Sequence, residues 1–357
     1  MRRGGTGDIR MDSAAVVADS RAWIGGQAGR WNEAVRTAVM RVFVERPLAY
    51  INLEEIARMP GLSRGVAAAA IEALVREGVN IQSRAPLEYF FEPDADAMHP
   101  DCVTARLRTR WWGRAVWVGG EITSTIDIAK ELINQDDSHG TVITAEYQKQ
   151  GRGRQGSRWI SRKGRDLLVT FLIQLADWEP SPTLLSLYAV TAVARVLDTA
   201  YQIPVSIKWP NDVIIQGRKA GGVLVEKIDA RRMVLISLGL NVHSRPADWP
   251  PELRGQTTSL ALARNEDWQR DLLLAQCGTT WEALWEHMVR DRGETVRSYW
   301  RQYSSTLGRP VTLRHRRQSL TGVAQDIDEW GRLILRAGDG RVLHLLQEEV
   351  RDLEVIE

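Results

Sequence analysis

The chain has little cysteine and no long hydrophobic run. Its 357 residues contain 2 cysteines, Cys102 and Cys277, which excludes a disulfide framework and a zinc site of four thiolates. So few cysteines are typical of a protein from a reducing compartment. Both are expected to be packing residues rather than nucleophiles. Nowhere do about 18 apolar residues follow one another, and no apolar segment follows the basic start. The sequence therefore predicts a cytoplasmic protein without a signal peptide or a membrane partner.

The chain also lacks a strong net charge. Its 47 basic and 45 acidic residues give a formal net charge of +2, and 44% of the residues are hydrophobic. This balance is ordinary for a globular protein, and the length suffices for two or three domains with full cores. The segment 149–165 is a local exception, because it holds seven basic residues and no acidic one. These seven are Lys149, Arg152, Arg154, Arg158, Arg162, Lys163 and Arg165.

Within that segment, residues 151–159 read Gly-Arg-Gly-Arg-Gln-Gly-Ser-Arg-Trp. Glycine lets a backbone approach an anion and adopt positive φ, while arginine offers planar donors that match phosphate oxygens. Trp159 adds an aromatic plane. The pattern predicts a loop that closes over a ligand bearing a phosphate and a base. Taken alone, these residues leave open a solvated surface loop or an Arg-Gly contact to nucleic acid.

The first third of the chain predicts a small helical domain. Residues 1–32 are expected to be a poorly ordered extension, and residues 33–95 to form a winged helix-turn-helix-like domain. Three helices are predicted at 34–45, 53–59 and 63–77, followed by a wing at 79–81 and 88–91. Ser63 suits the N-cap of the third helix. That helix carries Arg64 and then an alanine run, so a structural or dimerisation role stands beside DNA binding.

The remainder predicts two further domains after a linker at 93–100. Residues 108–304 alternate a few helices with hairpin-linked strands, which favours an α+β domain around a mixed sheet. Strands are predicted at 115–118, 142–147, 166–175, 205–208, 213–216, 222–227 and 233–242. Helices are predicted after Ser124, at 183–200 and at 281–303, with a break at 292–293. Residues 307–357 predict short strands at 311–314, 320–326, 332–336 and 341–346.

Four separated motifs in this order resemble the biotin protein ligase family. The first is residues 145–159, which include the loop 151–159, called the arginine loop below. The others are Lys-Trp-Pro-Asn-Asp at 208–212, Lys-Ala-Gly-Gly-Val-Leu-Val-Glu at 219–226, and Gly-Leu-Asn-Val at 239–242. The order of domains over residues 36–357 is similar to that of the family's bifunctional ligase and repressor members. The resemblance implies a winged-helix start, a mixed-sheet catalytic domain like those of biotin and lipoate ligases, and an SH3-like barrel at the C-terminus.

The resemblance also implies roles for residues that would hold biotin. Ser124, Thr125 and Gln148, with the backbone at Gly151, match the positions that bind the ureido ring. Trp159, with Arg152 beside it, belongs to the loop that closes over this slot. One position departs from the family, where an asparagine often follows the Ser-Thr pair. Ile126 stands there, with Asp127 one place on, which puts the ring contacts from this helix in question.

Other matched residues are implied at the nucleotide. Arg152 and Arg154 resemble the residues that neutralise the ATP phosphates, and Asn211 and Asn241 resemble adenylate contacts. Lys219 resembles the lysine that contacts the biotin carboxylate and the α-phosphate, and it is counted with Arg154, Asp212 and Lys208 as a catalytic residue. Lys208 and Asp212 flank the same site; Asp212 is expected to help either Mg²⁺ or the incoming lysine amine. Residues 250–253 and 257–260 resemble the adenine-side loop.

The implied function is a two-step ligation with ATP, Mg²⁺ and biotin. The enzyme would form biotinyl-5′-AMP and then modify one lysine of a biotin carboxyl carrier protein such as that of acetyl-CoA carboxylase. Two alternatives stay open at this point: a lipoate or octanoate ligase, and a DNA-binding repressor for which the adenylate is a corepressor. The motifs at 151–154 and 208–212 favour biotin. A homodimer is expected only from family members of this architecture.

Overall fold

The computed structural model describes residues 27–94, 97–134, 138–316 and 318–356. By its internal contacts the chain divides into two compact units, Met1–Glu92 and Pro93–Glu357. Of the predicted extension over residues 1–32, residues 1–26 lie outside the described residues. Its last part is instead helical, because the first described helix begins at Gln27 rather than at residue 34.

The described part of the first unit contains three helices in the predicted order and a three-stranded antiparallel sheet, of which strand β1 was not predicted. The helices are α2 (Gln27–Glu45), α3 (Leu53–Ala57) and α4 (Arg64–Arg76), and the strands are β1 (Ile51–Asn52), β2 (Ile81–Ala85) and β3 (Glu88–Phe91). The predicted N-cap is confirmed, since the Ser63 hydroxyl accepts a hydrogen bond from the Val66 N–H. Strands β2 and β3 form a two-stranded wing as predicted, although β2 spans Ile81–Ala85 rather than residues 79–81, and β1 pairs with the other edge of β3.

The second unit is built on a seven-stranded sheet of order β4-β5-β6-β10-β9-β8-β7. These strands are β4 (Ala115–Ile122), β5 (Thr141–Gln148), β6 (Asp166–Gln174), β7 (Val205–Lys208), β8 (Asp212–Ile215), β9 (Arg218–Ile228) and β10 (Met233–Asn241). The β4–β5 pair is parallel and the other pairs are antiparallel. The predicted mixed sheet and α+β class are confirmed.

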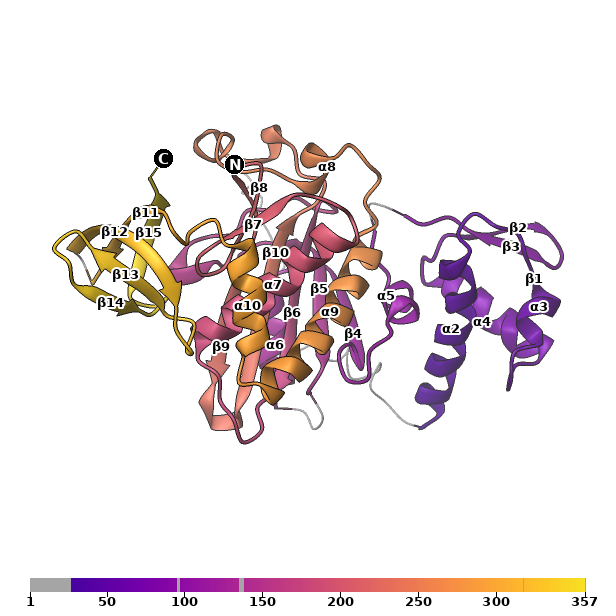
Figure 1. Ribbon diagram of the computed structural model, residues 1–357. Helices are drawn as coiled ribbons and strands as arrows, with labels where there is room; N and C mark the ends of the chain where they lie inside the picture. Colours follow the sequence, from indigo (N-terminus) through magenta and orange to yellow (C-terminus); the bar gives the residue numbers. More distant parts are fainter. Residues whose placement is uncertain (1–26, 95–96, 135–137, 317, 357) are drawn as a thin grey trace, which may run out of the picture. The chain divides into compact units, whose positions relative to one another are not determined.

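Helices cover both faces of this sheet, as Figure 1 shows. Helices α7 (Pro182–Thr199), α9 (Arg270–Arg290) and α10 (Glu294–Tyr303) share one core with Val234 and Ile236 of β10. The short helix α6 (Thr125–Leu132) packs against Leu235 from the same strand. Because successive side chains point to opposite faces, an apolar strand such as β10 serves both layers.

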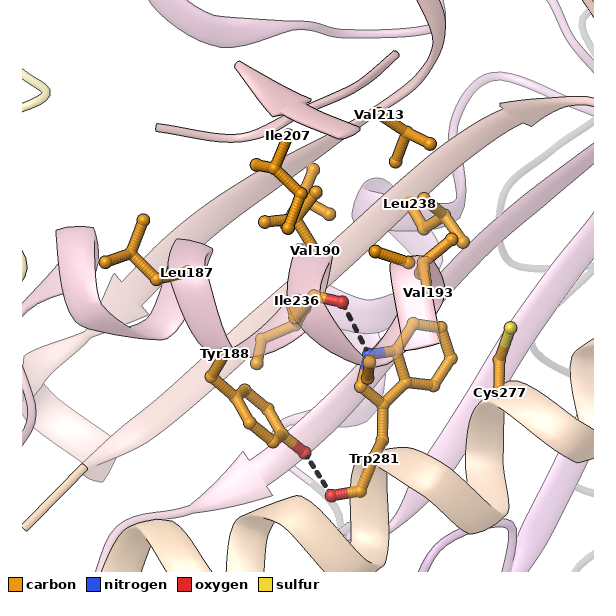
Figure 2. Packing of buried hydrophobic residues seen from close by; sticks show 14 of the residues in the cluster. Leu187, Tyr188, Val190, Val193, Ile207, Val213, Ile236, Leu238, Cys277 and Trp281 are labelled. Carbon is orange, nitrogen blue, oxygen red and sulfur yellow. Dashed lines mark hydrogen bonds between the residues drawn. The ribbon is translucent and has the colours of Figure 1, made fainter. Parts of the chain in front are cut away.

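Two hydrogen bonds join α7 to α9 within the larger core (Figure 2). The Tyr188 hydroxyl donates to the Trp281 carbonyl at 2.7 Å, and the Trp281 ring N–H donates to the Ala189 carbonyl at 3.0 Å. Cys277 lies in the same cluster, and burial raises the pKa of its thiol to about 12. Burial also raises the pKa of Cys102. Both cysteines are packing residues, as expected.

Some predicted boundaries were wrong. The segment 93–100, expected to be a linker, runs into a helix, α5 (Pro100–Arg106), capped by the His99 side chain. Helix α9 starts at Arg270 instead of residue 281, because Leu273, Leu274 and Cys277 continue its buried face. Within the described residues no helix combines the length and the apolar character needed to cross a membrane.

The C-terminal part folds into a five-stranded antiparallel sheet of order β14-β13-β12-β11-β15, drawn in yellow in Figure 1. Its strands are β11 (Pro310–His315), β12 (Gln318–Ile327), β13 (Leu333–Ala337), β14 (Val342–Leu345) and β15 (Val350–Val355). The first four match the predicted strands, and β15 was not predicted. Small connected strands of this kind agree with the predicted SH3-like barrel.

The buried Glu282 anchors the chain as it enters the large sheet. Its carboxylate accepts the N–H groups of Arg110, Trp111 and Trp112 at 2.6, 2.8 and 2.9 Å. Glu282→Ala would leave these donors without an acceptor, so we expect the free energy of unfolding to fall by about 3 kcal/mol. Urea denaturation measures this. The half-exposed Glu286, one turn on in α9, is the control, and its alanine variant should lose less than about 1 kcal/mol. Equal losses would contradict the anchoring role.

Candidate active site

A cavity of about 580 Å³ lies where the start of α6, the arginine loop, the turn before β8 and strands β9 and β10 meet. Residues of the C-terminal sheet complete its wall, among them Arg314 and Arg351. The structure brings nine of the twelve sequence-predicted site residues into this wall. They are Thr125, Gln148, Arg152, Arg154, Trp159, Lys208, Asn211, Asp212 and Lys219.

The other three predicted residues lie behind the wall and support it. Ser124 is fully buried as the N-cap of α6, and its hydroxyl donates to the Gln148 side-chain oxygen at 3.2 Å. The Gly151 carbonyl accepts the Trp159 N–H at 2.9 Å. The Asn241 amide donates to the Thr258 carbonyl at 2.9 Å and is 2% exposed. The nitrogen end of the Asn241 side chain thus binds the backbone, and a ligand contact through its Oδ1 stays a prediction.

Gln148 is held by donors from the start of α6. Its Oε1 accepts the Thr125 backbone N–H at 2.8 Å and the Thr125 hydroxyl at 3.1 Å, in addition to Ser124. The oxygen end of the side chain is therefore occupied, and the Nε2 end remains to donate to a ligand. Ile126 packs in the α6 core with Ala129 and is 2% exposed. The side chain that departs from the family thus contributes apolar surface to this corner.

The arginine loop is folded back on itself. Gly153 N–H donates to the Ser157 carbonyl at 2.8 Å, and residues 154–156 form a short 3-10 turn. The Trp159 ring lies directly over Gly239 of β10, since a Cβ on that glycine would come within 2.5 Å of the ring. Glycine is therefore required at position 239. Among the described residues, no hydrogen-bond partner faces the buried Trp159 ring N–H.

Two of the three loop arginines, Arg152 and Arg154, have partners that the sequence did not predict. Arg152 pairs with Asp127 at 2.5 Å. Arg154 donates to the Asn211 side-chain oxygen at 3.2 Å and to the Gln347 carbonyl, which belongs to the C-terminal part. Burial lowers the pKa of Arg154, and the negative charge of Asp212 opposes that effect. A desolvated guanidinium of this kind is stabilised further by an anionic ligand.

Asp212 is the carboxylate at the centre of a cationic cluster. Its Oδ1 lies 2.7 Å from the Lys219 ammonium, and its Oδ2 lies 4.0 Å from that of Lys208. With Arg154 nearby, three cations face one carboxylate, which favours a polyphosphate ligand. One carboxylate also fits Mg²⁺, because this ion usually takes one or two protein carboxylates together with nucleotide phosphates.

A second cavity of about 410 Å³ shares Gln148, Arg158 and Trp159 with the first. Pro250 and Pro251, from the segment predicted at the adenine side, line it. The next part of that segment pairs with Lys219. The Lys219 N–H donates to the Gln256 carbonyl at 2.8 Å, and the Thr258 N–H donates to the Lys219 carbonyl at 2.9 Å. The segment therefore adjoins both cavities.

Comparisons with known proteins agree with this geometry. Residues 118–243 match the biotin/lipoate A/B protein ligase family, and residues 306–350 match the biotin protein ligase C-terminal domain. The chain is 27% identical to the bifunctional ligase/repressor BirA of Bacillus subtilis, over 86% of this chain and 95% of that protein. It is 29% identical to the biotin–[acetyl-CoA-carboxylase] ligase of Mycobacterium tuberculosis, over 71% of this chain and 99% of that protein.

A solved structure is also similar. The biotin protein ligase of Aquifex aeolicus, determined in complex with biotin and ATP, superposes with a TM-score of 0.60 at 26% identity. The match covers 68% of this chain and all of that one. The two share the fold over the unit that contains the cavity.

Arg154→Ala tests whether the cavity binds a polyphosphate. The variant removes a desolvated cation, so we expect the Kd for ATP to rise about 10- to 100-fold. Isothermal titration calorimetry with ATP and Mg²⁺ measures it. Lys163→Ala is the matched control, because this exposed lysine belongs to the same basic segment and lies outside both cavity walls. Equal Kd values for the two variants would show that Arg154 does not contact the nucleotide.

Proposed function

Because its catalytic region belongs to the biotin/lipoate A/B protein ligase family, we propose that this chain is an ATP-dependent biotin protein ligase. One observation supports this most directly. A single cavity joins neutral hydrogen-bonding groups at Thr125 and Gln148 to the cations around Asp212. Biotin has a polar ureido ring and a carboxylate, and ATP brings phosphates, so the two sets of groups suit the two substrates.

The first step activates the carboxylate. A biotin carboxylate oxygen attacks the α-phosphorus of ATP, pyrophosphate leaves, and biotinyl-5′-AMP is formed. Negative charge grows on the α-phosphate oxygens, where Lys219 and Arg154 are the donors we assign. Lys219 needs little reorganisation for this, since Asp212 already holds its ammonium. Arg152 would complete the phosphate contacts after leaving Asp127.

Mg²⁺ would be held by Asp212 together with the nucleotide phosphates and would neutralise part of their charge. The side chains of the protein would position the ATP phosphates relative to the biotin carboxylate. Asn211 contributes by holding Arg154, and its own Nδ2 is fixed by the Val223 carbonyl at 2.6 Å. Asn211 is therefore assigned as a positioning residue for the adenylate.

The second step transfers the acyl group. The neutral ε-amino nitrogen of a carrier lysine attacks the anhydride carbonyl, AMP leaves, and an amide forms with loss of the amine proton. We assign Asp212 and Lys208 to the two sides of that amine, because they line the cavity beside Lys219. Trp159, lying over Gly239, would shield the anhydride from water. We propose a biotin carboxyl carrier protein of the acetyl-CoA carboxylase type as the acceptor, in the cytoplasm.

Operator binding is not part of this proposal. The described residues of the first unit, 27–92, carry eight arginines and eight glutamates, and no lysine or aspartate. Arg64, at the start of α4, pairs with Glu54 at 3.3 Å. Described residues with no net charge provide little of the phosphate attraction that DNA binding needs. A repressor role and a homodimer stay predictions of the sequence.

ATP–pyrophosphate exchange tests the proposed substrate. Purified protein with Mg²⁺ should exchange label in the presence of biotin and not with lipoate or octanoate, because only biotin offers ring N–H groups. Lys219→Ala should lower the exchange rate about 100-fold.

Exchange with lipoate or octanoate alone would agree with the fold but contradict the proposal that biotin is the substrate. Absence of exchange with all three acids would contradict the enzyme assignment and leave a binding or regulatory protein.

A further inference from the structure

A continuous chain of hydroxyl groups crosses the sheet beneath the cavity. The Thr125 hydroxyl lies 2.8 Å from that of Thr170 on β6, and the Thr170 hydroxyl lies 2.8 Å from that of Ser237 on β10. Thr170 and Ser237 are direct partners in the β6–β10 register. Thr170 is fully buried, while Ser237 is half-buried and lines the cavity. None of the four motifs that indicated the family contains Thr170 or Ser237.

The direction of these hydrogen bonds is fixed at one end. A backbone N–H can only donate, so the atom of Gln148 that lies 2.8 Å from the Thr125 N–H must be the oxygen. The Thr125 hydroxyl therefore donates its one hydrogen to that oxygen. It follows that Thr170 donates to Thr125 and that Ser237 donates to Thr170.

The Ser237 hydroxyl has already donated its one hydrogen to Thr170. Its Oγ can only accept from whatever occupies the cavity. Gln148 has the opposite character, because its oxygen is occupied and its Nε2 can only donate. The cavity thus presents an acceptor and a donor, which complement a ring that carries an N–H next to a C=O.

We propose that Ser237 is a specificity-determining residue that accepts a hydrogen bond from a ureido N–H of biotin, with Thr170 and Thr125 orienting its hydroxyl. This inference rests on the proposed function and adds to it a residue for discriminating among acids. The dithiolane ring of lipoate and the alkyl chain of octanoate have no N–H. Either acid would remove water from the Ser237 oxygen without replacing its hydrogen bond, and a site built for a donor rejects ligands that lack one.

Ser237→Ala and two ligand analogues test the contact. The analogues are biotin methylated on one or the other ureido nitrogen. Calorimetry should show that Ser237→Ala raises the Kd for biotin about tenfold. For the isomer whose methyl group replaces the bonded hydrogen, the same substitution should leave the Kd unchanged or lower it. A merely structural serine would not distinguish the two isomers.

Thr170→Val tests the orienting role, because it frees the Ser237 hydrogen to point elsewhere. It should raise the Kd for biotin and reduce the difference between biotin and the sensitive isomer. Thr144→Val is the matched control, since this buried threonine on β5 donates instead to the Leu168 carbonyl. Its Kd for biotin should equal that of the wild type.

The proposal is overturned if Ser237→Ala binds biotin as tightly as the wild type, or if it weakens biotin and both isomers equally. Exchange activity separates this failure from that of the proposed function. Biotin-dependent exchange by a wild type whose Ser237→Ala variant binds normally would overturn the serine contact alone. A wild type that neither binds biotin nor supports exchange with it would overturn both.

Discussion

The ion pair between Asp212 and Lys219 connects the fold to the chemistry of the cavity. The two residues lie on the paired strands β8 and β9, and a bulge between Val213 and Ile214 adjusts their register. A Cβ on Gly222 would lie 3.4 Å from both Asp212 Oδ1 and Lys219 Nζ, so the pair packs directly on a glycine of the sheet. The Lys219 backbone also holds residues 256–258. Strand pairing therefore fixes the position of the central charges.

The C-terminal sheet belongs to the site as well as to the fold. Arg154 reaches the Gln347 carbonyl, and the Gln155 side chain donates to the Val350 carbonyl at 2.9 Å. Both acceptors are backbone groups next to or within β15. The arginine loop is thus held by a segment that lies 193 to 195 positions further along the chain. This favours a role for the C-terminal sheet in seating the nucleotide.

The sequence predicted most of the scaffold because its signals are local. Alternating or continuous apolar runs located the strands of the large sheet, Ser63 was correctly expected as a helix cap, and a helix was correctly expected after Ser124. Helix α5 was missed because its seven residues are too few to show a helical apolar pattern. The extension of α9 to Arg270 carried a signal in the spacing of Leu273 and Leu274, which the prediction did not use.

The contacts that tune the site depend on partners distant in the chain, and no local pattern reports them. Arg152 forms an ion pair with Asp127, and Arg154 donates a hydrogen bond to a backbone carbonyl. The residue types predicted the positive charges but not the contacts that fix the two side chains. Asn241 carried a motif signal, yet its amide serves the Thr258 backbone. Thr170 and Ser237 could have been noticed as lone hydroxyls in otherwise apolar strands. Only the β6–β10 register shows that the hydroxyl groups of these two residues are hydrogen-bonded to each other.

The central claim is that one cavity brings the carboxylate of biotin to the α-phosphate of ATP and retains the product. The most direct test is to incubate the protein with biotin, ATP and Mg²⁺, separate it from free ligands by gel filtration, and identify the released small molecule by mass spectrometry. We expect retained biotinyl-5′-AMP in an amount equimolar with the protein. Recovery of unreacted biotin or ATP alone, without the adenylate, would contradict it.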